Sequence, residues 1–378
     1  QGRHDEAGLL YQRTLTIEEK THGRESPEFA RTLSNIGGLY GEQEQFAKAE
    51  PLFKRSLVIN ENTFGPNHLY VAADLSNLAS LYFEQKLYSK VEPLRTRSLK
   101  ILEKALGPEH PDVAHGYYCL AMLYLYEERI TEAELFFMRA LTIYGKVFDP
   151  YHSELLQPLK MLAELYERSG NQQESLDYIR RAVAIARARA ISYGNIESGG
   201  IGEQKLNRGV FLFHVKQALD MQNSSNRKML VSEAFESGQL TITAKAGAAI
   251  ENMANRFATG DDEIAILVRQ RQDAAERWQG LDKTFVKAIS QSPEDRNKIA
   301  EANLTKSLKE TNELLKELDR QLETSFPKFA ELSSGKPATL NDTQSLLSSK
   351  EALFTFISDS EATYAFLVRK DDALAYKI

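Results

Sequence analysis

The chain has 378 residues, of which 42% are hydrophobic and 26% charged, close to the averages of soluble globular proteins. Its formal net charge of −6 gives no bulk basic field for binding nucleic acid, and its single cysteine, Cys119, excludes an internal disulfide and a cysteine-rich zinc site. No run of 18 apolar residues predicts a membrane span. We therefore expect a cytoplasmic protein without nucleic-acid or membrane partners. Because the chain opens in the middle of a repeat, we also expect it to be a fragment.

Several residues recur every 42 positions in the first half of the chain. Leu-Tyr occurs at 39, 81, 123 and 165, arginine at 13, 55, 97, 139 and 181, and leucine at 15, 57, 99 and 141. Three such series with the same 42-residue spacing are not expected by chance. The pattern predicts a tandem array.

The residues of each unit predict two helices, A and B, as the third unit illustrates. Pro111 begins helix A, because the missing N–H of proline has no partner in a first helical turn. Leu120, Ala121 and Tyr124 then form one apolar stripe, and a polar turn at 127–129 precedes helix B. Neither helix can bury its stripe alone, so the units are expected to stack into a solenoid.

Two motifs carry a family resemblance. The run Leu75-x2-Leu78-Ala79-x2-Tyr82 and the pair Ala133-x3-Phe137 resemble the tetratricopeptide signature. The 42-residue spacing and the loop at 107–111 are similar to the kinesin-light-chain type of that repeat. The resemblance covers about residues 1–190 and implies a solenoid that binds a protein or peptide in its concave groove, without a cofactor.

In this family, the inner face of helix A lines the groove. The position before Leu78 is occupied, unit by unit, by Asn35, Asn77, Cys119 and Met161. An asparagine amide both donates and accepts hydrogen bonds, so Asn35 and Asn77 resemble the asparagines that grip an extended peptide in kinesin-light-chain-like grooves. The alternative is that both are merely solvated. Further inner-face candidates are Arg31, Ser80, Glu84 and Tyr126.

Histidines and glycines suggest two further sites that we do not favour. His68, His110 and His152 lie a full repeat apart in the loop before helix A, which predicts a local structural role and no metal site. Lone Cys119 is interpreted as a packing or groove residue. The glycines at 199, 200 and 202 follow no strand, so we interpret residues 191–206 as a flexible linker, not a phosphate loop.

The second half predicts short helices over 207–258 and then two long amphipathic helices. The first ends near Ser290, with an apolar side that comprises Ile266, Leu267, Ala274, Trp278, Leu281 and Phe285. The second enters at Pro293-Glu294 and carries leucines at 304, 308, 315 and 322. Together they predict an antiparallel coiled-coil hairpin that could self-associate. Alternatively, both helices pack on a neighbouring domain.

Beyond Phe326-Pro327 the pattern becomes α/β. Residues 339–356 predict a loop and a helix, and residues 364–368 and 373–378 predict two strands joined by a turn. Two strands are not stable alone, so we expect them to need a sheet that this sequence does not contain.

The segments 267–278, Phe326-Pro327 and Tyr364–Arg369 resemble the region leading into CHAT domains, which are caspase- and separase-like modules. The resemblance covers about residues 208–378. It implies a helical region over 207–335 and the truncated start of an α/β caspase-like domain over 336–378. Active members use a His–Cys dyad, and no residue here matches it, so we expect no enzyme activity from this chain.

The expected fold is mostly α: a tetratricopeptide solenoid over 1–190, the helical hairpin region, and the start of the α/β domain. The first functional hypothesis is a protein-binding module that serves as the sensor of a CHAT-domain protein. The alternatives are part of a repeat-gated cysteine peptidase and a self-associating scaffold. The architecture is more usual in bacteria.

Overall fold

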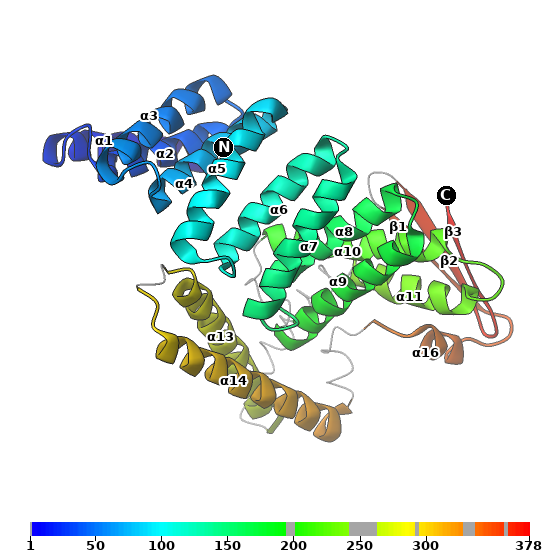
Figure 1. Cartoon of the computed structure of the whole chain (residues 1–378). Helices are drawn as coiled ribbons and strands as arrows, with labels where there is room; N and C mark the ends of the chain where they lie inside the picture. Colours follow the sequence, from blue (N-terminus) through cyan, green and yellow to red (C-terminus); the bar gives the residue numbers. More distant parts are fainter. Residues whose placement is uncertain (1, 194–200, 242–262, 292–294, 328–336, 359–361) are drawn as a thin grey trace. The chain divides into compact units, whose positions relative to one another are not determined.

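A computed structural model describes residues 2–193, 201–241, 263–291, 295–327, 337–358 and 362–378. The described chain is mostly helical, with a small sheet near its C-terminal end (Figure 1). It divides into two compact units, residues 1–147 with 290–296 and residues 148–289 with 297–378.

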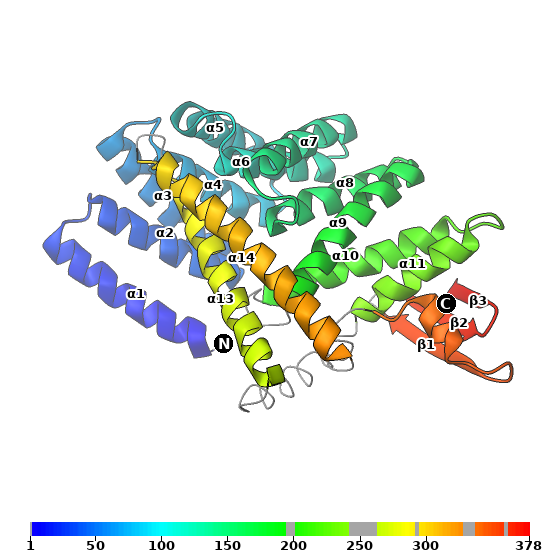
Figure 2. The ribbon, with the colours of Figure 1, turned by 90° about the horizontal axis from the view of Figure 1, so that it is seen from below.

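The first unit consists of helical hairpins in the predicted register. Its helices are α1 (Gly2–Thr21), α2 (Pro27–Glu42), α3 (Phe46–Phe64), α4 (Leu69–Glu84), α5 (Tyr88–Leu106), α6 (Pro111–Tyr126) and α7 (Ile130–Val147). The pairs α2/α3, α4/α5 and α6/α7 pack most closely, and each pair also contacts the next (Figure 2). These pairs are the A and B helices of the repeat, so the prediction of a solenoid is confirmed.

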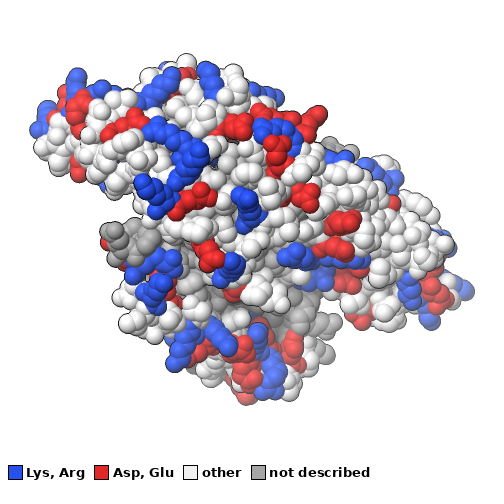
Figure 3. All heavy atoms as spheres, viewed as in Figure 1, with Lys and Arg blue, Asp and Glu red and all other residues white. Residues whose placement is uncertain are grey.

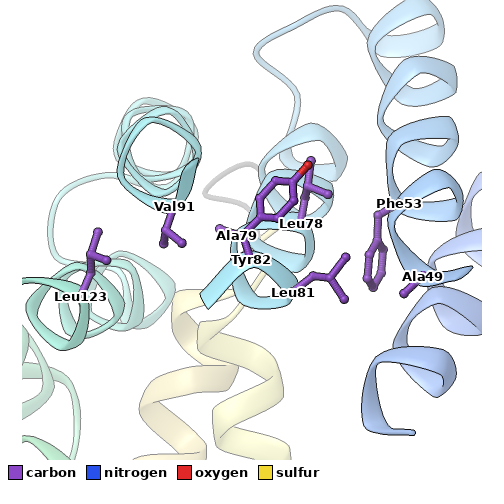
Figure 4. Close-up of a cluster of buried hydrophobic side chains, with 8 residues drawn as sticks. All are labelled: Ala49, Phe53, Leu78, Ala79, Leu81, Tyr82, Val91 and Leu123. Carbon is purple, nitrogen blue, oxygen red and sulfur yellow. The ribbon is translucent and has the colours of Figure 1, made fainter. Parts of the chain in front are cut away.

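A buried cluster joins successive hairpins (Figure 4). It combines residues of α3, α4, α5 and α6: Ala49, Phe53, Leu78, Ala79, Leu81, Tyr82, Val91 and Leu123. Ala49, Ala79 and Val91 have no exposed surface, and their small size lets the helices approach closely. Full burial of one large side chain is worth about 1.5–3 kcal/mol, so the stacking of hairpins stabilises helices that could not bury their stripes alone.

The recurring position before helix A is an N-cap. Nδ1 of His68, His110 and His152 accepts a hydrogen bond from the backbone N–H two residues later, at 3.2, 3.1 and 3.3 Å. Ser26, which lies one repeat before His68, has the same role, because its Oγ atom accepts a hydrogen bond from the backbone N–H of Phe29 at 3.2 Å. The local structural role predicted for these histidines is confirmed. The described residues contain no group of three or more His, Cys, Asp or Glu side chains able to hold a metal.

The cap gives a direct stability prediction at His68, which also stacks on Phe64 with a centroid separation of 4.4 Å. We expect His68→Ala to lower the free energy of unfolding by about 1 kcal/mol, because it leaves the N–H of Tyr70 without its acceptor. His68→Asn loses the same stacking but keeps a strong N-cap. Urea unfolding should therefore rank the asparagine variant above the alanine variant. Equal losses in both would show that stacking, not capping, is the main contribution.

In the second unit, hairpins continue past the region in which the 42-residue pattern is visible. A short 3-10 turn at Ser153–Leu155 leads into α8 (Leu156–Arg168), followed by α9 (Gln172–Tyr193), α10 (Ile201–Asp220) and α11 (Arg227–Leu240). Helix α9 packs on both α8 and α10, and α10 pairs with α11. Two ion pairs fix α9 to α11, Arg180–Glu233 at 3.0 Å and Arg187–Glu236 at 3.2 Å.

This continuation alters the expected linker at 191–206. Residues 191–193 end α9 and residues 201–206 begin α10, so helix replaces loop at both described ends of this segment. Short helices were predicted over 207–258, and the described part holds most of α10 and α11. The rest of that range, residues 242–258, lies outside the described residues. The predicted domain boundaries stay predictions.

The predicted antiparallel helical hairpin is present as α13 (Glu263–Ile289) and α14 (Lys298–Ser325), which lie side by side in both ribbon views. Trp278 packs with Leu315 and Leu318, and nearer the open end Val268 packs with Leu322. One detail of the prediction is wrong, because Ile266 is 44% exposed. Helix α14 begins at Lys298 with Asn297 as its N-cap, and the expected entry at Pro293-Glu294 lies outside the described residues.

The C-terminal segment forms α16 (Leu340–Ser345) and three strands, β1 (Ala352–Ser358), β2 (Thr363–Arg369) and β3 (Ala373–Lys377). The strands pair antiparallel in the order β1-β2-β3. The two predicted strands are confirmed, whereas the expected helix through residue 356 is wrong, because 352–358 is a strand. The chain thus supplies the third strand that the sheet needs.

One face of this sheet packs on α10 and α11. Phe366 meets Phe235 with centroids 5.9 Å apart, and Ile357 lies against Gly238. Gln222 Nε2 donates to the carbonyl of Ala375 at 3.3 Å. The sheet is therefore seated on the last described hairpin of the helical array.

Candidate partner-binding surface

All six predicted groove residues lie in the first unit and are exposed. Arg31 and Asn35 lie on α2, Asn77, Ser80 and Glu84 on α4, and Tyr126 at the end of α6. Within each helix these residues are three, four or seven positions apart, so they lie on one face of that helix. Helices α2 and α4 contact each other, so we expect the residues of these two helices to share one surface.

Asn35 and Asn77 occupy equivalent positions on neighbouring A helices. In the part of the chain that the structure describes, neither side-chain amide has a hydrogen-bond partner. Their donors and acceptors therefore face solvent, where they can bind a ligand. The packing beneath them is fixed, since the following residues, Ile36 and Leu78, are 8% and 4% exposed.

The asparagine column ends after two repeats, because Cys119 and Met161 occupy the next two equivalent positions. Cys119 is half-buried, with its Sγ atom 3.4 Å from Nε2 of His115. Burial alone would raise the pKa of this thiol, but the hydrogen bond with His115 and the charge of Arg95 outweigh it, so the pKa is lowered. Met161, in the second unit, is 7% exposed and part of the core.

Tyr126 contributes an aromatic contact surface to the first unit. It is 55% exposed and lies edge-on to Phe83, with centroids 5.1 Å apart, while Tyr88 packs beside both. Phe83 and Glu84 are the last two residues of α4, so an apolar and an acidic side chain lie next to each other in sequence at the end of this A helix.

Sequence reasoning missed Arg95 of α5. Its Nη2 atom donates to Ser80 Oγ at 3.3 Å, and its charge acts on Cys119. The signal was available, because Arg95 interrupts the Ala-x3-Phe pattern that Phe53 and Phe137 follow one repeat before and after.

Charged side chains elsewhere are mixed. On the face shown in Figure 3, basic and acidic residues are interspersed over the described part of the molecule. No described helix is both long and apolar enough to cross a membrane.

The stacked A and B hairpins define a helical repeat protein of the tetratricopeptide class. The profile of the tetratricopeptide repeat family matches residues 1–59, 28–104, 75–146 and 112–188. Residues 1–188 are therefore tetratricopeptide repeats, and the family is one of protein-interaction modules. The matches end at residue 188, so they do not extend over residues 208–378, and the comparisons give no evidence for the CHAT domain expected there.

Three solved structures are similar to part of this chain. BtubC (BKLC) from P. vanneervenii is 23% identical, with a TM-score of 0.46, and the match covers 50% of this chain and 74% of that one. The repeats of a candidate kinesin light chain from Podosopora anserina are 20% identical, with a TM-score of 0.45 and coverages of 59% and 97%. The apo form of RapI is 16% identical, with a TM-score of 0.46 and coverages of 71% and 89%. The curated proteins yield no match.

Proposed function

We propose that the exposed face of α2, α4 and α6 binds an extended peptide segment of a partner protein, with Asn35 and Asn77 contacting its backbone. The observation that carries this proposal is the pair of exposed, unengaged amides at equivalent positions of adjacent A helices. Packed helices lie about 8–10 Å apart, which about three residues of extended peptide can span. The two asparagines would then bind successive stretches of one peptide.

The other candidates would supply side-chain recognition. Arg31 offers a cation, Ser80 a hydroxyl group and Glu84 a carboxylate, while the aromatic surface at Tyr126 suits an apolar side chain. Backbone binding by asparagines is compatible with many sequences, so selectivity would come from these flanking residues.

The test selects random displayed peptides against the full chain and measures their dissociation constants by fluorescence anisotropy. The double variant Asn35→Ala/Asn77→Ala should bind about tenfold or more weakly, because each lost hydrogen bond is worth about 0.5–1.5 kcal/mol. Asn62→Ala/Asn67→Ala is the matched control, since both asparagines are exposed but lie outside the A helices. Unchanged affinity in the first variant, or equal losses in both, would contradict the proposal.

A second candidate role, as the sensor part of a CHAT-domain protein, has one supporting observation. The sheet carries apolar side chains on both faces, with Phe354, Phe356 and Tyr376 exposed at 56%, 49% and 58%. Apolar side chains on both faces are typical of sheets covered on both sides, as in α/β domains. The gene sequence downstream of Ile378 tests this role. A His and a Cys, each at the end of a predicted strand, would support a repeat-gated peptidase, and a continuation without them would leave a binding module.

A further inference from the structure

Arg95 occupies a position at which three other B helices, α3, α7 and α9, hold core residues. Phe53, Phe137 and Ile179, the equivalent residues, are 5%, 0% and 0% exposed. The guanidinium side chain in the same place is only half-buried. The replacement creates a cationic position within the stack of hairpins, next to the exposed face of α4.

The Arg95 guanidinium is incompletely partnered. Its single direct hydrogen bond to a described oxygen goes to Ser80 Oγ at 3.3 Å, and its Nε atom is buried without a partner in the described chain. No described carboxylate pairs with it, in contrast to Arg97, which binds Glu61 at 2.6 Å. Leaving a donor of a charged group buried and unsatisfied is costly, so this arrangement favours an added anion.

Nearby acids do not supply that anion. Glu92, one turn earlier on α5, accepts instead from Arg129 at 3.1 Å and from Tyr124 at 3.0 Å. Glu84 lies one turn beyond Ser80 on α4, and no salt bridge joins it to Arg95 within the described residues. On α6, Arg95 hydrogen-bonds the thiol of Cys119 and its charge helps to lower the pKa of that thiol, but no described carboxylate there pairs with Arg95.

We infer that Arg95 and Ser80, beside Asn77, form a binding site for a carboxylate side chain of the bound peptide. Asn77 and Ser80 lie one helical turn apart on α4, so a peptide held at Asn77 presents its next side chains to Ser80 and Arg95. The guanidinium and the hydroxyl group supply charge-assisted hydrogen bonds, which select an acidic residue over its neutral amide. This inference rests on the proposed function, because it assigns one side-chain position of the same ligand.

The only thiol in the chain, Cys119, reports on the site without any partner. Its thiolate attacks a disulfide reagent, forms a mixed disulfide and releases one aryl thiolate. We compare the anionic reagent dithionitrobenzoate with neutral dithiodipyridine and take the ratio of their rate constants. Arg95→Gln should lower that ratio about fivefold, as expected for removing one charge about 4 Å away in a water-like medium.

Two variants control this measurement. Arg95→Lys keeps the charge and should keep most of the ratio, and Lys100→Gln removes an exposed cation of α5 and should leave the ratio unchanged. A ratio that is the same in wild type and Arg95→Gln would overturn the site, whatever the outcome with peptides. Using a ratio of two reagents cancels the effect of Arg95 on the thiolate fraction.

The peptide selection supplies the second test. Peptides selected on the wild-type chain should carry Asp or Glu at one fixed position, and replacing that acid by its amide should weaken binding at least tenfold. The same replacement should change binding to Arg95→Gln less than twofold. Selected peptides without an acid, or an equal effect in both proteins, would refute the carboxylate site. In either case, weaker binding by Asn35→Ala/Asn77→Ala would still support the proposed peptide binding by these two asparagines, so the two proposals can fail separately. A preference for phosphoserine over glutamate at that position would also refute the carboxylate assignment.

Discussion

Gly238→Ala is expected to lower the free energy of unfolding of the second unit by about 2 kcal/mol. A β-carbon at this position of α11 would lie 1.8 Å from Cδ1 and 3.2 Å from Cγ1 of Ile357 in β1. Ile357 is 4% exposed and has little room to move away. The strain should therefore loosen the sheet from α10 and α11, and hydrogen exchange of residues 363–369 should become faster.

A double-mutant cycle identifies the source of this effect. Ile357→Val removes Cδ1, so adding it to Gly238→Ala should restore part of the lost stability. Gly209→Ala is the matched control in α10, because its added β-carbon would meet only Lys160 Cε at 3.5 Å, an ordinary contact. If Gly238→Ala and Gly209→Ala cost the same, or if Ile357→Val brings no recovery, the close approach does not govern how the sheet is held.

Asp74→Ala should cost about 3 kcal/mol in the first unit, because it removes the acceptor shared by two buried donors, Ser56 and Asn60, and by the part-buried Ser34. The Asp74 carboxylate is 3% exposed and accepts from Ser34 Oγ at 2.8 Å, Ser56 Oγ at 2.8 Å and Asn60 Nδ2 at 2.6 Å. Asp74→Asn should be much milder. Oδ1 of Asn60 has no partner in the described chain, so a flipped Asn60 amide can accept from the side-chain amide that this substitution introduces.

The same pair of proteins tests a pH dependence. Burial raises the pKa of Asp74 above its usual value near 3.8, and the three hydrogen bonds only partly oppose this shift. The folded state therefore binds more protons than the unfolded state between the two pKa values. The stability that protonated Asp74 contributes is present below the unfolded pKa and is lost as pH rises through the folded one.

The wild-type chain should accordingly lose stability relative to Asp74→Asn as pH is raised from about 4, until Asp74 is fully ionised in both states. Urea unfolding of both proteins across this range, followed by circular dichroism, measures the difference. If the stability difference does not change with pH, or grows in favour of the wild type, the pKa of Asp74 is not raised in the folded protein.

The helical hairpins of the first unit could be predicted because their determinants are local and repeated. Pro111, the turn at 127–129 and the recurring Leu-Tyr pair fix where helices begin, end and bury a stripe. The partners of these residues could not be predicted in the same way. Tyr82 donates to Glu50 at 2.8 Å, and Tyr124 repeats the bond to Glu92, but such bonds join residues 32 positions apart on different helices.

The missed features depend on tertiary contacts. Strand β1 has an irregular burial pattern, and only its pairing with β2 and its contact with α11 make it a strand. Helices α10 and α11 continue the hairpin array without the 42-residue columns, so a change in periodicity was mistaken for a change in structure. The exposure of Asn35 and Asn77 follows from helix periodicity, whereas the incomplete partnering of Arg95 requires the positions of three neighbouring helices.

Photo-crosslinking of a selected peptide tests the central claim most directly. A peptide that carries one photoreactive residue is bound to the full chain and irradiated, and the adducts are located by mass spectrometry. The account predicts adducts on the A helices, within residues 27–42, 69–84 and 111–126. Adducts confined to the B helices α3, α5 and α7, or to residues 263–378, would contradict peptide binding on the face that Asn35 and Asn77 share.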